Sequence, residues 1–204
     1  MNNLHKAIGD ISSIRMQVAR STEFRGYGPA TLAATGAFAA AAAWAQARWL
    51  PDPASHFLIY LAIWISTAAV SASLIGTQMF TRTRRIHSGL ADEMIRMAVE
   101  QFLPAVAAGG LLSFVIPFFV PAIIWTLPGL WQVTFSLGVF SSCRFLPRPM
   151  LAAGVWYLLT ALICLALAGN RALSPWAMGV PYGAGQLLVA AVLYFHASEH
   201  EDEN

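Results

Sequence analysis

The residues best suited to bind a ligand inside this chain lie together in one apolar stretch, Gly179-Val-Pro-Tyr-Gly-Ala-Gly-Gln186. Pro181 has no backbone N–H, so it loosens a helix, and Tyr182 and Gln186 would then offer polar contacts. Gly179 and Gly183 have the GxxxG spacing that lets a second helix approach closely. The stretch therefore predicts either a close helix contact with a kink, or a broken helix that lines a cavity.

A histidine motif near the end of the sequence has metal-binding spacing, but we expect no metal there. His196-Ala-Ser-Glu-His200 matches the inverted zinc-protease pattern H-x-x-E-H. It lies four residues before the last residue, where a helix should fray, and no later residue supplies a third ligand. His56 and His87 fall at boundaries on opposite faces of the predicted bundle, so they cannot clamp a haem. The sequence therefore predicts no metal and no cofactor.

Charged side chains are missing from the middle of every predicted membrane segment. Proton relays, ion pathways and voltage sensors usually need one there. The nearest, Glu100 and Arg144, belong at the membrane boundary, which disfavours transport coupled to an intramembrane carboxylate. The sequence contains no nucleotide-binding loop, nucleophile–base pair or zinc cluster. We therefore expect a non-enzyme rather than an enzyme, and no nucleic-acid partner.

Membrane helices are the elements that must position these residues. Hydrophobic residues make up 57% of the 204 residues and charged residues 11%, whereas about a quarter of a soluble domain is charged. The predicted fold class is all-α: a polytopic integral membrane protein with six transmembrane helices forming one bundle over residues 29–197. The predicted spans are residues 30–50, 56–80, 102–127, 130–145, 150–168 and 175–196.

Small residues and prolines give two of these spans a predicted shape. The first span has an alanine row at every fourth position, which favours a place inside the bundle or at an oligomer face. This row is Ala33, Ala37, Ala41 and Ala45. A leucine at Ala37 or Ala41 should then disrupt folding or assembly. In the third span, Pro104 should bend the chain, and Pro128-Gly129 should form the external turn that follows.

Two helices and a tail are predicted outside the bilayer. Residues 3–19, within a cytoplasmic segment of residues 1–28, have an amphipathic pattern typical of a helix on the membrane surface. The same spacing would also suit a coiled-coil partner or self-association. Residues 88–101 predict an interfacial helix between the second and third spans. The acidic residues 198–204 predict a disordered tail.

The distribution of positive charge predicts the orientation of the bundle. With both termini in the cytoplasm, the inner segments hold ten of the twelve basic residues, as the positive-inside rule requires. The other two, Arg48 and Arg171, lie outside. The inner ten are Lys6, Arg15, Arg20, Arg25, Arg82, Arg84, Arg85, Arg96, Arg144 and Arg148. The preference for arginine over lysine, with abundant alanine and glycine, is typical of a GC-rich bacterium, so the expected location is the bacterial inner membrane.

Arg82, Arg84 and Arg85 form the densest cluster of positive charge and directly follow the second predicted span. They fix the orientation of the loop and meet the negatively charged leaflet of the lipid bilayer, with about 1 kcal/mol of attraction per residue. The same side chains would also suit contacts to anionic lipid or to an acidic patch on a partner protein.

Two functions remain open from the sequence. The first is a membrane-embedded regulatory or accessory subunit that presents its cytoplasmic helices to a partner protein, because the expected outer loops are minimal. The second is a small homodimeric transporter or channel. Its site would lie at the third and sixth spans, which glycine and proline interrupt in corresponding positions of the two halves.

Overall fold

The computed structural model describes residues 28–85, 89–143 and 150–202, and every regular element in these ranges is a helix. The predicted amphipathic helix of residues 3–19 lies outside the described residues, as does the link between the fourth and fifth spans at residues 144–149. The elements are α2 (Pro29–Trp49), α3 (Phe57–Arg85), α4 (Gly89–Phe119), the 3-10 helix η1 (Pro121–Thr126), α5 (Leu127–Ser142), α6 (Met150–Leu167), α7 (Gly169–Ala172) and α8 (Pro175–Asp202).

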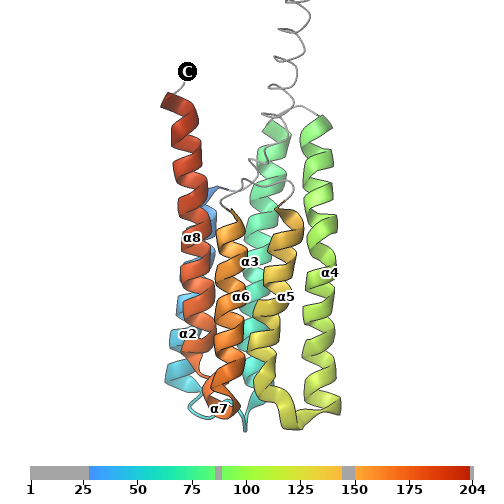
Figure 1. Cartoon of the computed structure of the whole chain (residues 1–204), viewed down its shortest axis with the longest axis vertical. Coiled ribbons are helices and arrows are strands. Elements are labelled where there is room, and N and C mark those ends of the chain that lie inside the picture. The colour runs from blue at the N-terminus through green and yellow to red at the C-terminus, as the bar shows by residue number, and fades with distance from the viewer. Residues whose placement is uncertain (1–27, 86–88, 144–149, 203–204) are drawn as a thin grey trace, which may run out of the picture.

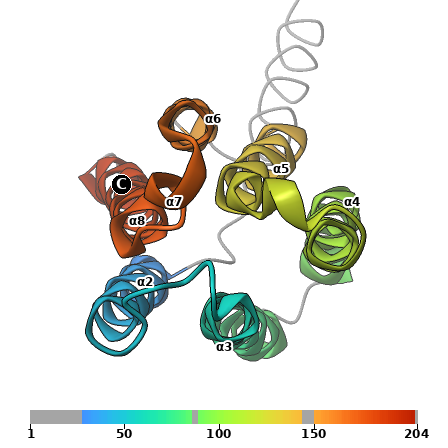
Figure 2. The ribbon, with the colours of Figure 1, turned by 90° about the horizontal axis from the view of Figure 1, so that it is seen from below.

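Six long helices stand side by side and form a ring. Figure 1 shows their axes running in nearly the same direction, with α7 and the connection between α4 and α5 at one end. Seen along the axes, the order around the ring is α2, α3, α4, α5, α6 and α8 (Figure 2). Each neighbouring pair in this order is in contact, and α8 closes the ring by packing along α2. The first and last described helices are therefore direct neighbours.

Five helical stretches among the described residues are long and apolar enough to cross a membrane, which supports the predicted class of all-helical, multi-pass membrane protein. They are Phe57–Thr81, Val99–Phe119, Pro121–Ser142, Met150–Leu167 and Gly169–Phe195. The helix that does not meet this criterion is α2. Its 21 residues reach roughly 31 Å, enough for a span, but it also contains two threonines, Gln46 and Arg48, which lower its mean hydropathy.

The helix α4 differs from the prediction at both ends. It runs without interruption from Gly89 through Pro104 and Pro117 to Phe119, so residues 89–101 are its first part and no separate interfacial helix is present in this range. Membrane helices tolerate an internal proline because the freed backbone group can find another partner. Pro104 therefore lies inside a continuous helix, and the bend predicted there stays a prediction.

The turn between α4 and α5 lies earlier than predicted. The chain leaves α4 at Val120 and passes through η1, whereas Pro128 and Gly129 are buried in the first turn of α5. Proline is well tolerated in the first turn of a helix, where its missing N–H has no partner to lose. Gly129 is used for packing, since a Cβ there would lie 2.6 Å from the side chain of Leu165. The Pro-Gly pair was therefore wrongly interpreted as a turn.

The last helix is longer than predicted. α8 continues to Asp202, so most of the segment expected to be a disordered tail belongs to a helix. Its interior proline, Pro181, does not interrupt it.

The alanine prediction for α2 also needs correction. α2 packs closely within the bundle, but the residues at its contact with α8 are Gly36, Ala39 and Ala43 rather than the predicted alanine row.

Ala37 and Ala41 face outward and are exposed. A leucine at either position would therefore not block the α2–α8 contact. A role of this alanine row in an oligomer contact stays a prediction.

Candidate functional site: a polar seam along α8

A buried glutamine on α2 joins three helices at the end of the bundle where α8 begins. Gln46 is fully buried, and its Nε2 donates a hydrogen bond to the Leu173 carbonyl at 2.8 Å. Its Oε1 accepts one from Trp64 Nε1 on α3, also at 2.8 Å. The Leu173 carbonyl needs this donor because the Ala177 N–H bonds the Ser174 carbonyl instead. Gln46 therefore replaces a missing helical bond and holds α3 to the same point.

A second buried glutamine, Gln132, bonds another free backbone carbonyl one turn further along α8. Pro181 has no N–H, so it leaves the Ala177 carbonyl without its helical partner. Gln132, fully buried on α5, donates from Nε2 to that carbonyl at 2.9 Å. The carbonyl of Pro181 itself accepts from Trp156 Nε1 on α6 at 3.0 Å. Side chains of α2, α5 and α6 thus bond carbonyls spaced by four residues, and α8 stays helical through the proline.

Tyr182, one of the predicted contact residues, lies in an aromatic cluster. Its ring centroid is 5.3 Å from that of Tyr157 on α6 and 5.5 Å from that of Phe135 on α5. Tyr157 is fully buried, and its hydroxyl lies against the α8 backbone, where a Cβ added to Gly185 would be 2.5 Å from it. The structure therefore brings Tyr182 together with a second tyrosine, next to the predicted Gln186.

The GxxxG pair predicted in α8 packs against α2. A Cβ added to Gly179 would lie 2.4 Å from the Cβ of Ala43, and Gly183 lies beside the carbonyl of Gly36. A Cβ on Gly36 would in turn lie 3.2 Å from the Cβ of Gln186. These contacts support the interpretation of the stretch as a close helix contact, and α8 is not the broken helix of the alternative.

Four buried polar atoms make no hydrogen bond of ordinary geometry among the described residues: Tyr60 Oη, Gln132 Oε1, Tyr157 Oη and Gln186 Oε1. The side chains of Tyr157 and Gln186 nevertheless lie close enough to interact with each other. Leaving such an atom unpaired in an apolar interior is costly, so sites of this kind usually hold water or a polar ligand. Two of the four are amide oxygens and two are hydroxyls, so none of them carries a charge. Within the described ranges, no group of three His, Cys, Asp or Glu side chains is placed to hold a metal ion.

Sequence reasoning missed most of this seam. Gln46, Tyr60 and Tyr157 were not singled out, although a lone glutamine or tyrosine inside an apolar span was the available signal. The predicted cluster Arg82, Arg84 and Arg85 falls in the last turns of α3. This is the end of the bundle opposite Arg48 and α7 (Figure 1).

Comparison of the chain with models of known protein families, with curated proteins and with solved structures gives no match. The functional proposals below therefore rest on the geometry of the bundle and on the chemistry of its residues.

Proposed function

We propose that this protein is a membrane-embedded accessory or regulatory subunit that presents helical extensions to a partner protein on one side of the bilayer. The observation that supports this proposal is the length of three helices. α3, α4 and α8 have 29, 31 and 28 residues, whereas about 20 residues cross the roughly 30 Å hydrocarbon layer. Each of the three helices is therefore about 12 Å or more longer than a perpendicular span needs.

All three helices extend at the same end of the bundle. Figure 1 shows α3, α4 and α8 reaching well beyond the ends of α5 and α6, which have only 16 and 18 residues. At the opposite end the helices stop together and are joined by short connections at residues 50–56, 120 and 168–174 together with η1. A partner protein would thus find ordered surface outside the membrane mainly at the extended end.

The charges of the extensions suit recognition by a protein partner. The end of α3 contains three arginines, whereas the end of α8 contains Glu199, Glu201 and Asp202. A surface with separated positive and negative groups favours one orientation of a docking partner over others. The positive-inside rule supports a cytoplasmic location for the end with the arginines. We therefore propose six spans with both termini in the cytoplasm, and a bacterial inner membrane as the location.

Site-specific photocrosslinking tests the partner proposal directly. A photoreactive amino acid is placed at Glu199 on the extended end of α8, and in a control variant at Asn170 on the opposite end. After illumination of native membranes we expect a discrete crosslinked band with position 199 and none with position 170. Deleting residues 1–24 in the position-199 variant would then show whether the N-terminal segment contributes to the contact. Equal or absent crosslinking at both positions would overturn the proposal.

The orientation is tested separately with cysteines at Ser198 and Asn170, in a background where Cys143 and Cys164 are replaced by alanine. A membrane-impermeant maleimide added to intact cells should label the cysteine at 170 and spare the one at 198. Labelling at 198 in intact cells would contradict the six-span orientation.

The four unpaired polar atoms favour a second candidate function, a small homodimeric transporter or channel for neutral polar solutes. Glycerol is a suitable probe, measured by the light scattering of shrinking proteoliposomes. If Tyr182 and Gln186 line the route, Tyr182→Phe and Gln186→Leu should change the glycerol flux, and so should Pro181→Ala. Ile163→Val, at an exposed position of α6, is the control. A wild-type flux no higher than that of empty liposomes would exclude this solute route.

A further inference from the structure

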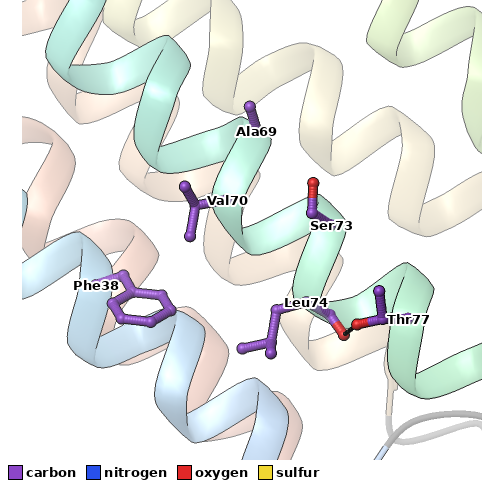
Figure 3. Close-up of a pocket in the computed structure, with 6 residues that line it drawn as sticks. All are labelled: Phe38, Ala69, Val70, Ser73, Leu74 and Thr77. Atoms are coloured by element: carbon purple, nitrogen blue, oxygen red, sulfur yellow. Dashed lines mark hydrogen bonds between the residues drawn. The ribbon is translucent and has the colours of Figure 1, made fainter.

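A groove runs along the outer surface between α2 and α3, away from the polar seam. It has a volume of about 440 Å³ and is lined by Phe38 of α2 and by Ala69, Val70, Ser73, Leu74 and Thr77 of α3. Figure 3 shows the ring of Phe38 across from this stretch of α3. Phe38 is 41% exposed and Val70 53% exposed, so the groove opens sideways toward the surroundings of the bundle.

The chemistry of the groove suits a hydrocarbon chain. Four of its six lining side chains are apolar. The hydroxyl of Thr77 donates to the Leu74 carbonyl at 3.0 Å within its own helix, as Figure 3 shows, so it needs no polar partner from the groove. Because Phe57–Thr81 is an apolar stretch able to cross the membrane, the molecules that meet the groove are lipids.

Positive charge continues the same stripe of α3 beyond the groove. Ser73, Thr77 and Arg84 follow at spacings of four and seven, which place their backbone positions on one face of a helix. Arg84 is roughly 10 Å further along the helix axis than Thr77, toward the end of α3. Arg85 lies beside it, whereas Arg82 lies about 160° around the helix from Arg84.

The start of α2 adds to this positive potential. The Gly28 N–H donates to Gln78 Oε1 on α3 at 3.1 Å, which places the beginning of α2 next to the end of the groove nearer the arginines. The first turn of a helix is the positive end of its dipole. A negatively charged group at this end of the groove would therefore be attracted by the beginning of α2 and by the positive charge carried at the end of α3.

We propose that this groove binds one anionic phospholipid, with an acyl chain between Phe38 and α3 and the headgroup at the end of α3 that carries Arg84 and Arg85. Charge complementarity selects this occupant over a zwitterionic lipid, because the arginines attract the net negative charge that phosphatidylcholine lacks. The proposal is independent of the accessory-subunit and transporter proposals, since it uses neither the helical extensions nor the polar seam.

Native mass spectrometry of the purified protein tests the lipid site. The protein is titrated with dioleoyl phosphatidylglycerol or dioleoyl phosphatidylcholine, and the retained adducts are counted. We expect one phosphatidylglycerol to be retained in preference to phosphatidylcholine. Arg84→Gln should reduce this preference about fivefold, the effect of one arginine near the membrane surface. Arg82→Gln removes the same charge from another face of α3 and should leave the preference unchanged.

Filling the groove tests where the acyl chain lies. Ser73→Trp should abolish the retained adduct with either lipid, and Ala69→Phe should weaken it. Ala72→Trp adds the same bulk at an exposed position on the other side of α3 and should retain the lipid. Circular dichroism and thermal unfolding check that each variant is folded. Equal losses for Arg82→Gln and Arg84→Gln, or full retention by both Ser73→Trp and Ala69→Phe, would overturn the proposed site.

Discussion

The two sides of the ring are held together by different means. α5, α6, α8 and α2 pack through glycines and through side chains that bond backbone carbonyls of a neighbouring helix. α3 and α4 contribute little to this interior: 33% of the residues in the apolar stretch of α6 are buried, compared with 17% in α3 and 6% in α4. Yet α3 and α4 carry many of the large apolar side chains that are exposed.

This contrast illustrates what drives helix association in a membrane. A leucine facing lipid is as well solvated as one facing another helix, so apolar side chains alone do not bring helices together. Close backbone approach and hydrogen bonds do. The side formed by α2, α5, α6 and α8, called the tight side below, has both of them. α4 has them at its contact with α5, where Gly138 lies against Phe102 and Trp131 Nε1 donates to Ser113 Oγ. One example is Gly154 on α6, where a Cβ would lie 2.5 Å from the ring of Phe140 on α5. Ser136 adds a 2.8 Å hydrogen bond to the Gly154 carbonyl.

The largest expected effect comes from adding bulk at a helix contact of the tight side. Gly179→Leu should destabilise the bundle by about 3 kcal/mol or more, because its side chain would collide with Ala43 on α2. The free energy of unfolding is measured in mixed detergent micelles. Gly110→Leu on α4 is the control, since a Cβ at Gly110 meets no atom within 4 Å. Equal losses in the two variants would remove the distinction between the two sides.

Gln46 makes the buried hydrogen bond that attaches α3 to α2. Gln46→Leu leaves both the Leu173 carbonyl and the Trp64 indole N–H without their partner, so we expect a loss of about 2 kcal/mol. Thr77→Val is the control on α3, because it removes a hydrogen bond made within one helix. A loss for Thr77→Val as large as that for Gln46→Leu would show that hydrogen bonds between helices have no special weight here.

The seam at Pro181 allows a double-mutant test. Gln132→Leu should cost about 1 kcal/mol, because the Ala177 carbonyl loses its donor. In the background of Pro181→Ala, residue 181 regains a backbone N–H that can bond this carbonyl, so the same substitution should cost much less. Unfolding of the four proteins in mixed micelles gives the coupling free energy, expected near 1 kcal/mol. A coupling of zero would show that Gln132 does not compensate for the proline.

The smallest effect is expected in the loop that joins α2 to α3. Hydrogen bonds from the Ser55 hydroxyl and N–H hold the pKa of Asp52 below its ordinary value. The associated stability is present above the unfolded-state pKa and is lost as the pH falls through the folded-state pKa. Ser55→Ala should raise the pKa of Asp52, measured by NMR titration of its carboxyl carbon. Ser66→Ala, on α3, is the control and should leave that pKa unchanged.

Hydropathy was enough to predict the helical membrane class and the approximate positions of most helices. α6 begins at Met150 as predicted, and α8 begins at Pro175 as predicted. Prolines were the main source of error, because the same residue can break a helix, lie inside one or begin one. The outcome depends on whether another group bonds the carbonyl that the proline leaves without a helical partner. The sequence near Pro181 does not show that Gln132 will bond the Ala177 carbonyl.

The candidate site was predictable only in part for a similar reason. Tyr182, Gln186 and the GxxxG pair stand out locally, because they are neighbours in the sequence. Gln46 and Leu173 are separated by 127 residues, and no local pattern indicates that they meet. The alanine row of α2 predicted close packing, but which alanines face α8 depends on the rotation of the helix.

By itself, therefore, the sequence determined that the chain is a bundle of membrane helices and where most of its charge lies. Both follow from the composition of single segments and from the high cost of burying charge in lipid. Only the tertiary structure decided which small residues let α2 and α8 approach and which side chains bond the carbonyls along α8. The groove between α2 and α3 was decided in the same way. Each of these depends on how two helices are rotated toward one another, and contacts across the bundle set that rotation.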